Sequence, residues 1–216
     1  MSSPGAEVEP GDALTTASKT ERGLLRGGTD GNEILTSGAA AVLVVLLLAE
    51  GVTIVQMRGL VTVHMFIGMV LIPPVLLKLG STGYRFARYY MRAPTYREKG
   101  PPPLPLRLLA PVLVLATVGV FVTGVVLLLS GHRSHTVLQL HKLSFIVWGV
   151  VFAVHFLAHV ARVAASMRRD WNASGRRAVP GAGVRAMLVV ASVGGGVALA
   201  LALLGTMTGW NGGHFH

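Results

Sequence analysis

Five stretches of the chain are almost free of charged residues and long enough to cross a lipid bilayer. A helix of about 20 residues, rising about 1.5 Å per residue, spans a hydrocarbon core of about 30 Å. Only 13% of the 216 residues are charged and 52% are hydrophobic, too little charge to coat a soluble domain of this size. The sequence therefore predicts an all-α integral membrane bundle with spans at about residues 34–57, 60–79, 106–130, 137–163 and 184–207.

The segments outside the spans predict the domain organisation and the orientation. Residues 1–33 lack apolar periodicity and are expected to form a disordered tail, residues 34–209 the membrane domain, and residues 210–216 a short external tail. Lysine and arginine gather in the loops after the second and fourth spans, so these loops and the N-terminus are expected to be cytoplasmic, with the C-terminus outside. This distribution explains the net charge of +10 without a nucleic-acid partner and predicts a multi-pass protein of the plasma membrane.

Three local patterns refine these helices. A tight connection is expected at Arg58-Gly59, between the first two spans. The second span is expected to continue as an amphipathic helix to Tyr90, with aromatic and arginine residues suited to the membrane interface. In the fifth span, Ser192 and Gly196 have the small-xxx-small spacing that allows a close helix approach.

The chain has no cysteine, which limits the cofactors that it can hold. Disulfides, thiolate metal sites, iron–sulfur clusters and covalently attached c-type haem are all excluded. A metal or cofactor must therefore be held without a covalent link, by histidine, carboxylate, methionine or lysine. No nucleotide-binding motif is present.

Ionisable residues inside the spans form a regular pattern, and such residues are functional candidates. His64 and Lys78 lie fourteen positions apart in the second span, and His141 and His155 lie fourteen apart in the fourth. Fourteen residues return to nearly the same helix face about 21 Å further along. Because both spans enter from the outside, His64 and His141 are expected at similar depth near the outer face. Lys78 and His155 are expected nearer the cytoplasm.

Two facing imidazoles from neighbouring helices are what six-coordinate haem iron needs. Ligation by two imidazoles leaves no open position, which suits electron transfer. We therefore expect haem b with His64 and His141 as axial ligands. A second haem near His155 would complete an electron path across the bilayer.

This arrangement resembles the cytochrome b and bacterial cytochrome b561-like superfamily. The resemblance rests on the histidine spacing and on the stretches Thr123–Leu129, Leu140–Lys142 and Val154–His159, and it covers roughly residues 34–165. It implies a four-helix haem-binding core plus a fifth transmembrane helix, with four histidines in two haem sites. His64, His141 and His155 match three of those positions, whereas the fourth is Lys78. Gly38 and Gly51 resemble glycines that let a flat haem approach a neighbouring helix.

The inner pair leaves several roles open. Lys78 can extend its amine towards the cytoplasmic interface, act as a neutral axial ligand, or balance the charge of a haem propionate. His155 can be an axial ligand to an asymmetric inner haem, a proton-relay residue, or the remnant of a lost site. His159, one turn further on, can be an alternative ligand or can orient another ligand.

Three other residues are candidates for a supporting role. Glu50 lies at nearly the depth of His64 and can accept a hydrogen bond from its ring or take a proton from a quinol. Alternatively it is protonated, or paired with Lys142 or Arg133. Arg58 and Arg133 can pair with haem propionates or anchor the membrane interface.

The sequence thus predicts a membrane b-type cytochrome that receives electrons from a quinol or a redox partner protein. The lack of any soluble domain suggests a relay or a subunit of a larger membrane complex. One rival is an oxidoreductase component that oxidises quinol or reduces ferric iron; the sequence assigns no catalytic residue. A second rival is a haem-free scaffold or transporter whose histidines are structural or carry protons.

Overall fold

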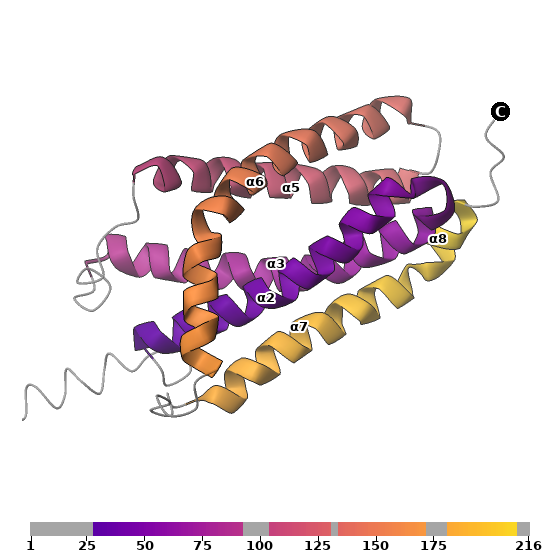
Figure 1. Cartoon of the computed structure of the whole chain (residues 1–216). Helices are drawn as coiled ribbons and strands as arrows, with labels where there is room; N and C mark the ends of the chain where they lie inside the picture. Colours follow the sequence, from indigo (N-terminus) through magenta and orange to yellow (C-terminus); the bar gives the residue numbers. More distant parts are fainter. Residues whose placement is uncertain (1–27, 93–103, 131–133, 172–180, 211–216) are drawn as a thin grey trace, which may run out of the picture.

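Every element in the described part of the chain is a helix. The computed structural model describes residues 28–92, 104–130, 134–171 and 181–210. The helices, shown in Figure 1, are α2 (Gly28–Val55), α3 (Met57–Tyr90), α5 (Leu104–Ser130), α6 (His135–Trp171), α7 (Ala182–Ala202) and the short α8 (Leu204–Gly209). Five of them are long and apolar enough to cross a membrane, which confirms the predicted multi-pass helical bundle.

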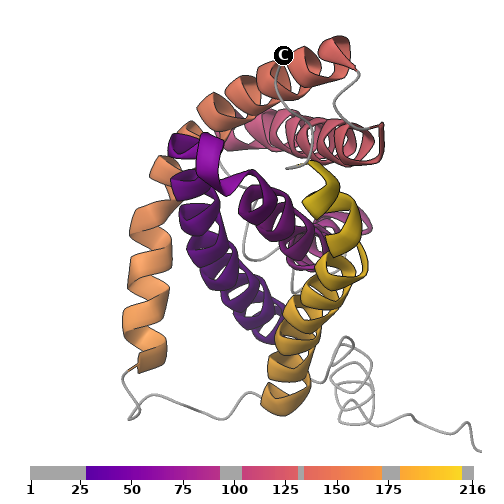
Figure 2. The ribbon, with the colours of Figure 1, turned by 90° about the vertical axis from the view of Figure 1, so that its right-hand side faces the viewer.

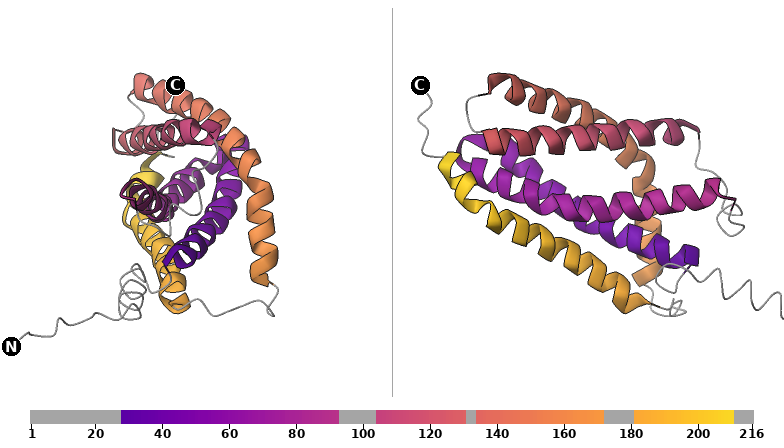
Figure 3. Two further views of the ribbon diagram at one scale, coloured as in Figure 1. Left: turned by 90° about the vertical axis from the view of Figure 1, so that its left-hand side faces the viewer. Right: turned by 180° about the vertical axis from the view of Figure 1, so that it is seen from behind.

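The helices pack as two groups. Helices α2, α3 and α7 lie together, α5 and α6 form a pair, and α5 joins the groups by its contact with α3. Figure 2 shows the second group lying against one side of the first. Successive long helices alternate in direction, so α3 and α6 run the same way, as expected from the sequence (Figure 1). The second half of α6 turns away from α5 and crosses the bundle (Figures 1 and 3).

Few side chains in the described residues are fully buried, because most apolar side chains lie on the outside of the helices. Leu48, Leu115 and Val190 are typical, with 67%, 72% and 70% of their surfaces exposed. This suits a lipid-facing surface. The main buried cluster joins α3, α5, α7 and α8 through Met69, Val70, Leu128, Ala200 and Met207.

The predicted close approach in the last span is confirmed at Gly196. A Cβ atom on Gly196 would lie 2.9 Å from the Val70 Cα atom of α3 and would also overlap the Val70 carbonyl oxygen. Pro74 explains why that carbonyl is accessible, because proline has no N–H to bond the oxygen four residues earlier. The Gly196 Cα–H group therefore lies against the Val70 carbonyl oxygen, which has no N–H donor at position 74 of its own helix.

Two boundaries differ from the sequence-based prediction, and one connection agrees with it. Helix α2 begins at Gly28, ahead of residue 34, because Asn32 Nδ2 donates a 3.1 Å hydrogen bond to Ser81 O and ties this polar turn to α3. The first connection is where the sequence predicts it: it extends from the turn at Gln56 to Leu60, whose backbone is not helical, and so includes Arg58-Gly59. The last span is interrupted at Leu203, and α8 then places Met207 in the buried cluster. Of the two predicted tails, residues 1–27 and 211–216 lie outside the described residues.

Candidate functional site

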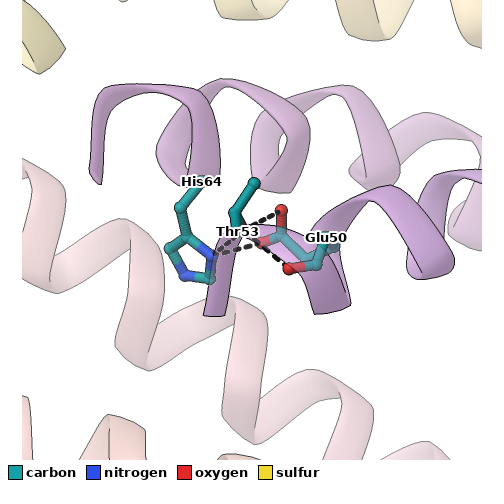
Figure 4. A network of polar contacts seen from close by, with 3 residues as sticks. All are labelled: Glu50, Thr53 and His64. Atoms are coloured by element: carbon teal, nitrogen blue, oxygen red, sulfur yellow. Dashed lines mark hydrogen bonds and ion pairs between the residues drawn. The ribbon is translucent and has the colours of Figure 1, made fainter. Parts of the chain in front are cut away.

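His64, in the first turns of α3, is held by two residues from the end of α2. Its Nδ1 atom lies 2.9 Å from Glu50 Oε1 and 3.1 Å from Thr53 Oγ1. Figure 4 shows both side chains directed at this one ring nitrogen. Glu50 and Thr53 are three residues apart and so share a helix face. The predicted hydrogen bond between Glu50 and the outer histidine is therefore present, whereas Lys142, its alternative partner, is exposed.

His141, in the first turns of α6, is held in a similar way by α5. Its Nδ1 atom lies 3.0 Å from Thr123 Oγ1. The ring packs against the neighbouring Gly124, where an added Cβ would lie 3.1 Å from His141 Cε1. Further along the same two helices, Trp148 Nε1 donates a 3.1 Å hydrogen bond to Thr117 Oγ1. Thr123 and Gly124 thus provide the anchor and the space for the ring.

The hydrogen bonds indicate which ring nitrogen carries the proton. Thr123 Oγ1 lies 2.7 Å from Gly119 O, to which it donates its one proton, so towards His141 it can only accept. Thr53 likewise donates to Glu50 O at 2.6 Å, and a carboxylate also accepts. Both neutral imidazoles therefore carry the proton on Nδ1 and leave the Nε2 lone pair available. The contacts with Glu50, Thr53 and Thr123 are all made through Nδ1.

The two rings lie next to each other across the helix groups, in an edge-on arrangement. Their centroids lie 6.5 Å apart and their planes are inclined by 70°. Two imidazoles that held one metal ion from opposite sides would place their centroids about 6.2 Å apart, from metal–nitrogen bonds of about 2 Å and about 1.1 Å from each nitrogen to its centroid. The donor set, the tautomer and the separation therefore fit axial ligation of one haem iron.

A groove lies beside this pair, between α2 and α6. It has a volume of about 220 Å³ and is walled on the α2 side by aliphatic residues, Glu50 and Gly51. The α6 wall is a ladder of stacked rings on the face that also carries His141, formed by Phe145, Trp148, Phe152 and Phe156. A Cβ added to Gly51 would have no atom within 4 Å, whereas one added to Gly38 would contact Val189 of α7. Gly51 alone of the two glycines therefore borders an open space beside the histidines.

Lys78 belongs to a different polar cluster, between α2 and α3. Its Nζ atom donates a 3.0 Å hydrogen bond to Thr36 O, and Thr36 Oγ1 donates to Ser81 Oγ at 2.9 Å. Within the described residues, no hydrogen bond, ion pair or ring contact joins Lys78 to His155. This does not test the predicted inner pair, because two ligands of one haem need not contact each other, and an inner haem stays a prediction.

The remaining candidates lie outside the pair. Arg58 is exposed near the start of α3. His155 and His159 follow His141 along α6, and the His159 side chain is not among the described ones. Arg133 lies outside the described residues. No group of three or more metal-ligating side chains occurs within the described ranges, which leaves a two-histidine site as the metal candidate there.

Sequence reasoning missed Thr53 and Thr123, the two hydroxyl residues that orient the rings. A signal existed for Thr53, since it lies one helical turn after the intramembrane acid Glu50. Comparison of the chain with protein-family models, with curated proteins and with solved structures finds no match.

Proposed function

We propose that the chain is a membrane b-type cytochrome that carries electrons, with one haem b held by His64 and His141. The observation that carries the proposal is the 6.5 Å separation of the two ring centroids, with each Nδ1 atom engaged by a neighbouring helix. Such hydrogen bonds fix the orientation of a ligating histidine and raise its basicity. A haem in this site would supply one-electron redox chemistry.

In this proposal the protein holds, orients and encloses the haem. Helices α3 and α6 supply the ligands, and α2 and α5 supply the acceptors that orient them. The apolar groove between α2 and α6 offers flat aromatic and aliphatic walls to a flat, apolar ring system. Two histidine ligands leave no open coordination position, which favours electron transfer over oxygen chemistry. The proposed donor is a quinol or a redox partner protein, in the plasma membrane, with the orientation that the basic loops predict.

The first test is spectroscopic. Protein expressed with ample haem supply and purified in detergent is expected to contain about one b haem per chain, with a low-spin reduced-minus-oxidised spectrum. Because the imidazole planes are inclined by 70°, the ferric protein should give the strongly anisotropic electron paramagnetic resonance signal of near-perpendicular axial ligands. A colourless protein would support the haem-free alternative instead.

The groove provides a second test that leaves both histidines intact. Gly51→Leu is expected to lower haem content severalfold, because its Cβ meets no atom within 4 Å and the branched side chain would extend into the groove. Gly80→Leu is the matched control, since Gly80 is exposed on α3, away from the groove, and also has nothing within 4 Å. Equal haem content in both variants would show that the groove takes no part in haem binding.

A further inference from the structure

The two histidines are supported by different chemistry, and we propose that Glu50 sets the redox potential of the bound haem. Through its hydrogen bond to His64 Nδ1, the carboxylate would favour the oxidised iron. Glu50 is thus a positioning and tuning residue that acts through His64. The inference rests on the proposed function, because it concerns the same pair of ligands.

The asymmetry lies at the two Nδ1 atoms. His64 has a carboxylate oxygen at 2.9 Å, and only 13% of the Glu50 side chain is exposed. His141 has a neutral hydroxyl at 3.0 Å, whose proton is already donated to the α5 backbone. Glu50 is also the one acid within the five spans predicted from the sequence. Placing a carboxylate inside the bilayer costs free energy. A neutral side chain could make a purely structural contact without that cost.

The support on α2 is built to hold that carboxylate in place. Thr53 is 2% exposed and lies 3.4 Å from Glu50 Oε2, in addition to its contacts with Glu50 O and His64. A Cβ on Gly68 would lie 3.6 Å from Glu50 Oε1, so the side chain packs directly against α3. The carboxylate is therefore fixed between two helices rather than extended towards the membrane surface.

The direction of the effect follows from charge. Hydrogen bonds to an ionised acceptor are about twice as strong as those between neutral groups, so Glu50 draws on the His64 Nδ1 proton more than Thr123 draws on that of His141. Electron density at His64 Nε2 then rises. Both this density and the nearby negative charge, in a medium of low dielectric constant, stabilise the oxidised form, which carries one more positive charge. Hydrogen bonding around the ligands is one of the ways in which proteins adjust haem potential.

The test is a redox titration of the haem-loaded protein at one fixed pH, in wild type, Glu50→Gln and Glu50→Asp. The glutamine amide oxygen keeps an acceptor on a side chain of the same length but removes the charge, whereas the aspartate keeps the charge. Glu50→Gln is expected to retain haem and to raise the ratio of reduced to oxidised protein at a given ambient potential by about tenfold, about 59 mV for one electron. Glu50→Asp should stay nearer to wild type. Glu33→Gln, at the exposed start of α2, is the control and should leave the potential unchanged.

The outcomes separate this inference from the proposed function. Wild-type protein without haem overturns both. Haem-loaded Glu50→Gln with the wild-type potential overturns the inference and leaves the cytochrome proposal in place. Loss of haem from both Glu50 variants also overturns it, since Glu50 would then serve the shape of the site. Loss from Glu50→Gln alone overturns it as well, because the charge would then hold the ligand rather than set the potential.

Discussion

Replacement of either His64 or His141 by alanine is expected to remove haem from the purified protein. In the proposed site each ring would supply one of the two bonds that hold the haem, and no group of three or more metal-ligating side chains occurs in the described residues to replace it. Loss of a hydrogen-bonding partner of a ligand typically lowers metal affinity 10–100-fold, so loss of the ligand itself should lower haem content by at least about tenfold. Haem per chain, measured as the pyridine complex and compared with protein mass, checks the prediction.

Two further variants are the controls for these substitutions. His135→Ala should keep its haem, because His135 is exposed on α6 and contacts only Gln139, at 3.3 Å. His155→Ala tests the predicted inner site: unchanged haem content supports a single outer haem, whereas loss of one haem out of two assigns His155 as a ligand. His64→Gly with added imidazole should regain a low-spin spectrum. Full haem content in both His64→Ala and His141→Ala would contradict the proposed site.

The number and type of the helices could be predicted from the sequence because the hydropathy of each segment indicates whether it lies in lipid or in water. Helix ends were predicted less well, because contacts between helices determine them. The first two turns of α2 contain Asp30 and Glu33, which hydropathy places outside the membrane, yet the hydrogen bond from Asn32 to Ser81 on α3 ties these turns to the bundle. The interruption at Leu203 likewise serves a contact between helices, the insertion of Met207 into the buried cluster.

The pairing of His64 with His141 could be predicted from the sequence. Equal depth followed from the fourteen-residue spacing and the parallel spans, and the structure places His64 beside His141. The hydroxyl anchors were not predictable in the same way. Thr53 contacts His64 of α3 and Thr123 contacts His141 of α6. The spacing from Glu50 points to Thr53, but no pattern within α5 points to Thr123, because threonine is common in membrane helices.

The role of Lys78 depends on a partner that no pattern in the sequence indicates. Its amine donates to a backbone carbonyl of another helix, that of Thr36. Every residue carries a carbonyl, so the side-chain sequence cannot single out this acceptor. The hydrogen bond to Thr36 accounts for the half-buried amine of Lys78 without a role as an iron ligand. The resemblance noted in the sequence would instead place a ligating histidine at this position.

The largest expected effect on stability is at Gly196, which lies against the backbone of α3. An alanine there would place its Cβ 2.9 Å from Val70 Cα and 3.0 Å from Val70 C. These are backbone atoms of a helix that contains Pro73 and Pro74, so a side-chain rotation cannot relieve the overlap and α7 must move away from α3. Overpacking of this kind costs about 1–3 kcal/mol for an added methyl group. A larger residue such as leucine should prevent the two helices from packing.

Neighbouring glycines make this prediction specific. Gly194 and Gly195 belong to the same run, are exposed, and have nothing within 4 Å of an added Cβ. Gly195→Ala should therefore be neutral or slightly stabilising, because alanine has the higher helix propensity. Unfolding in mixed detergent micelles measures the difference, with Gly196→Ala expected to unfold at lower denaturing-detergent content than Gly195→Ala. Equal stability of the two variants would mean that α7 does not pack on α3 through Gly196. The fifth helix would then not be fixed beside the helix that carries His64.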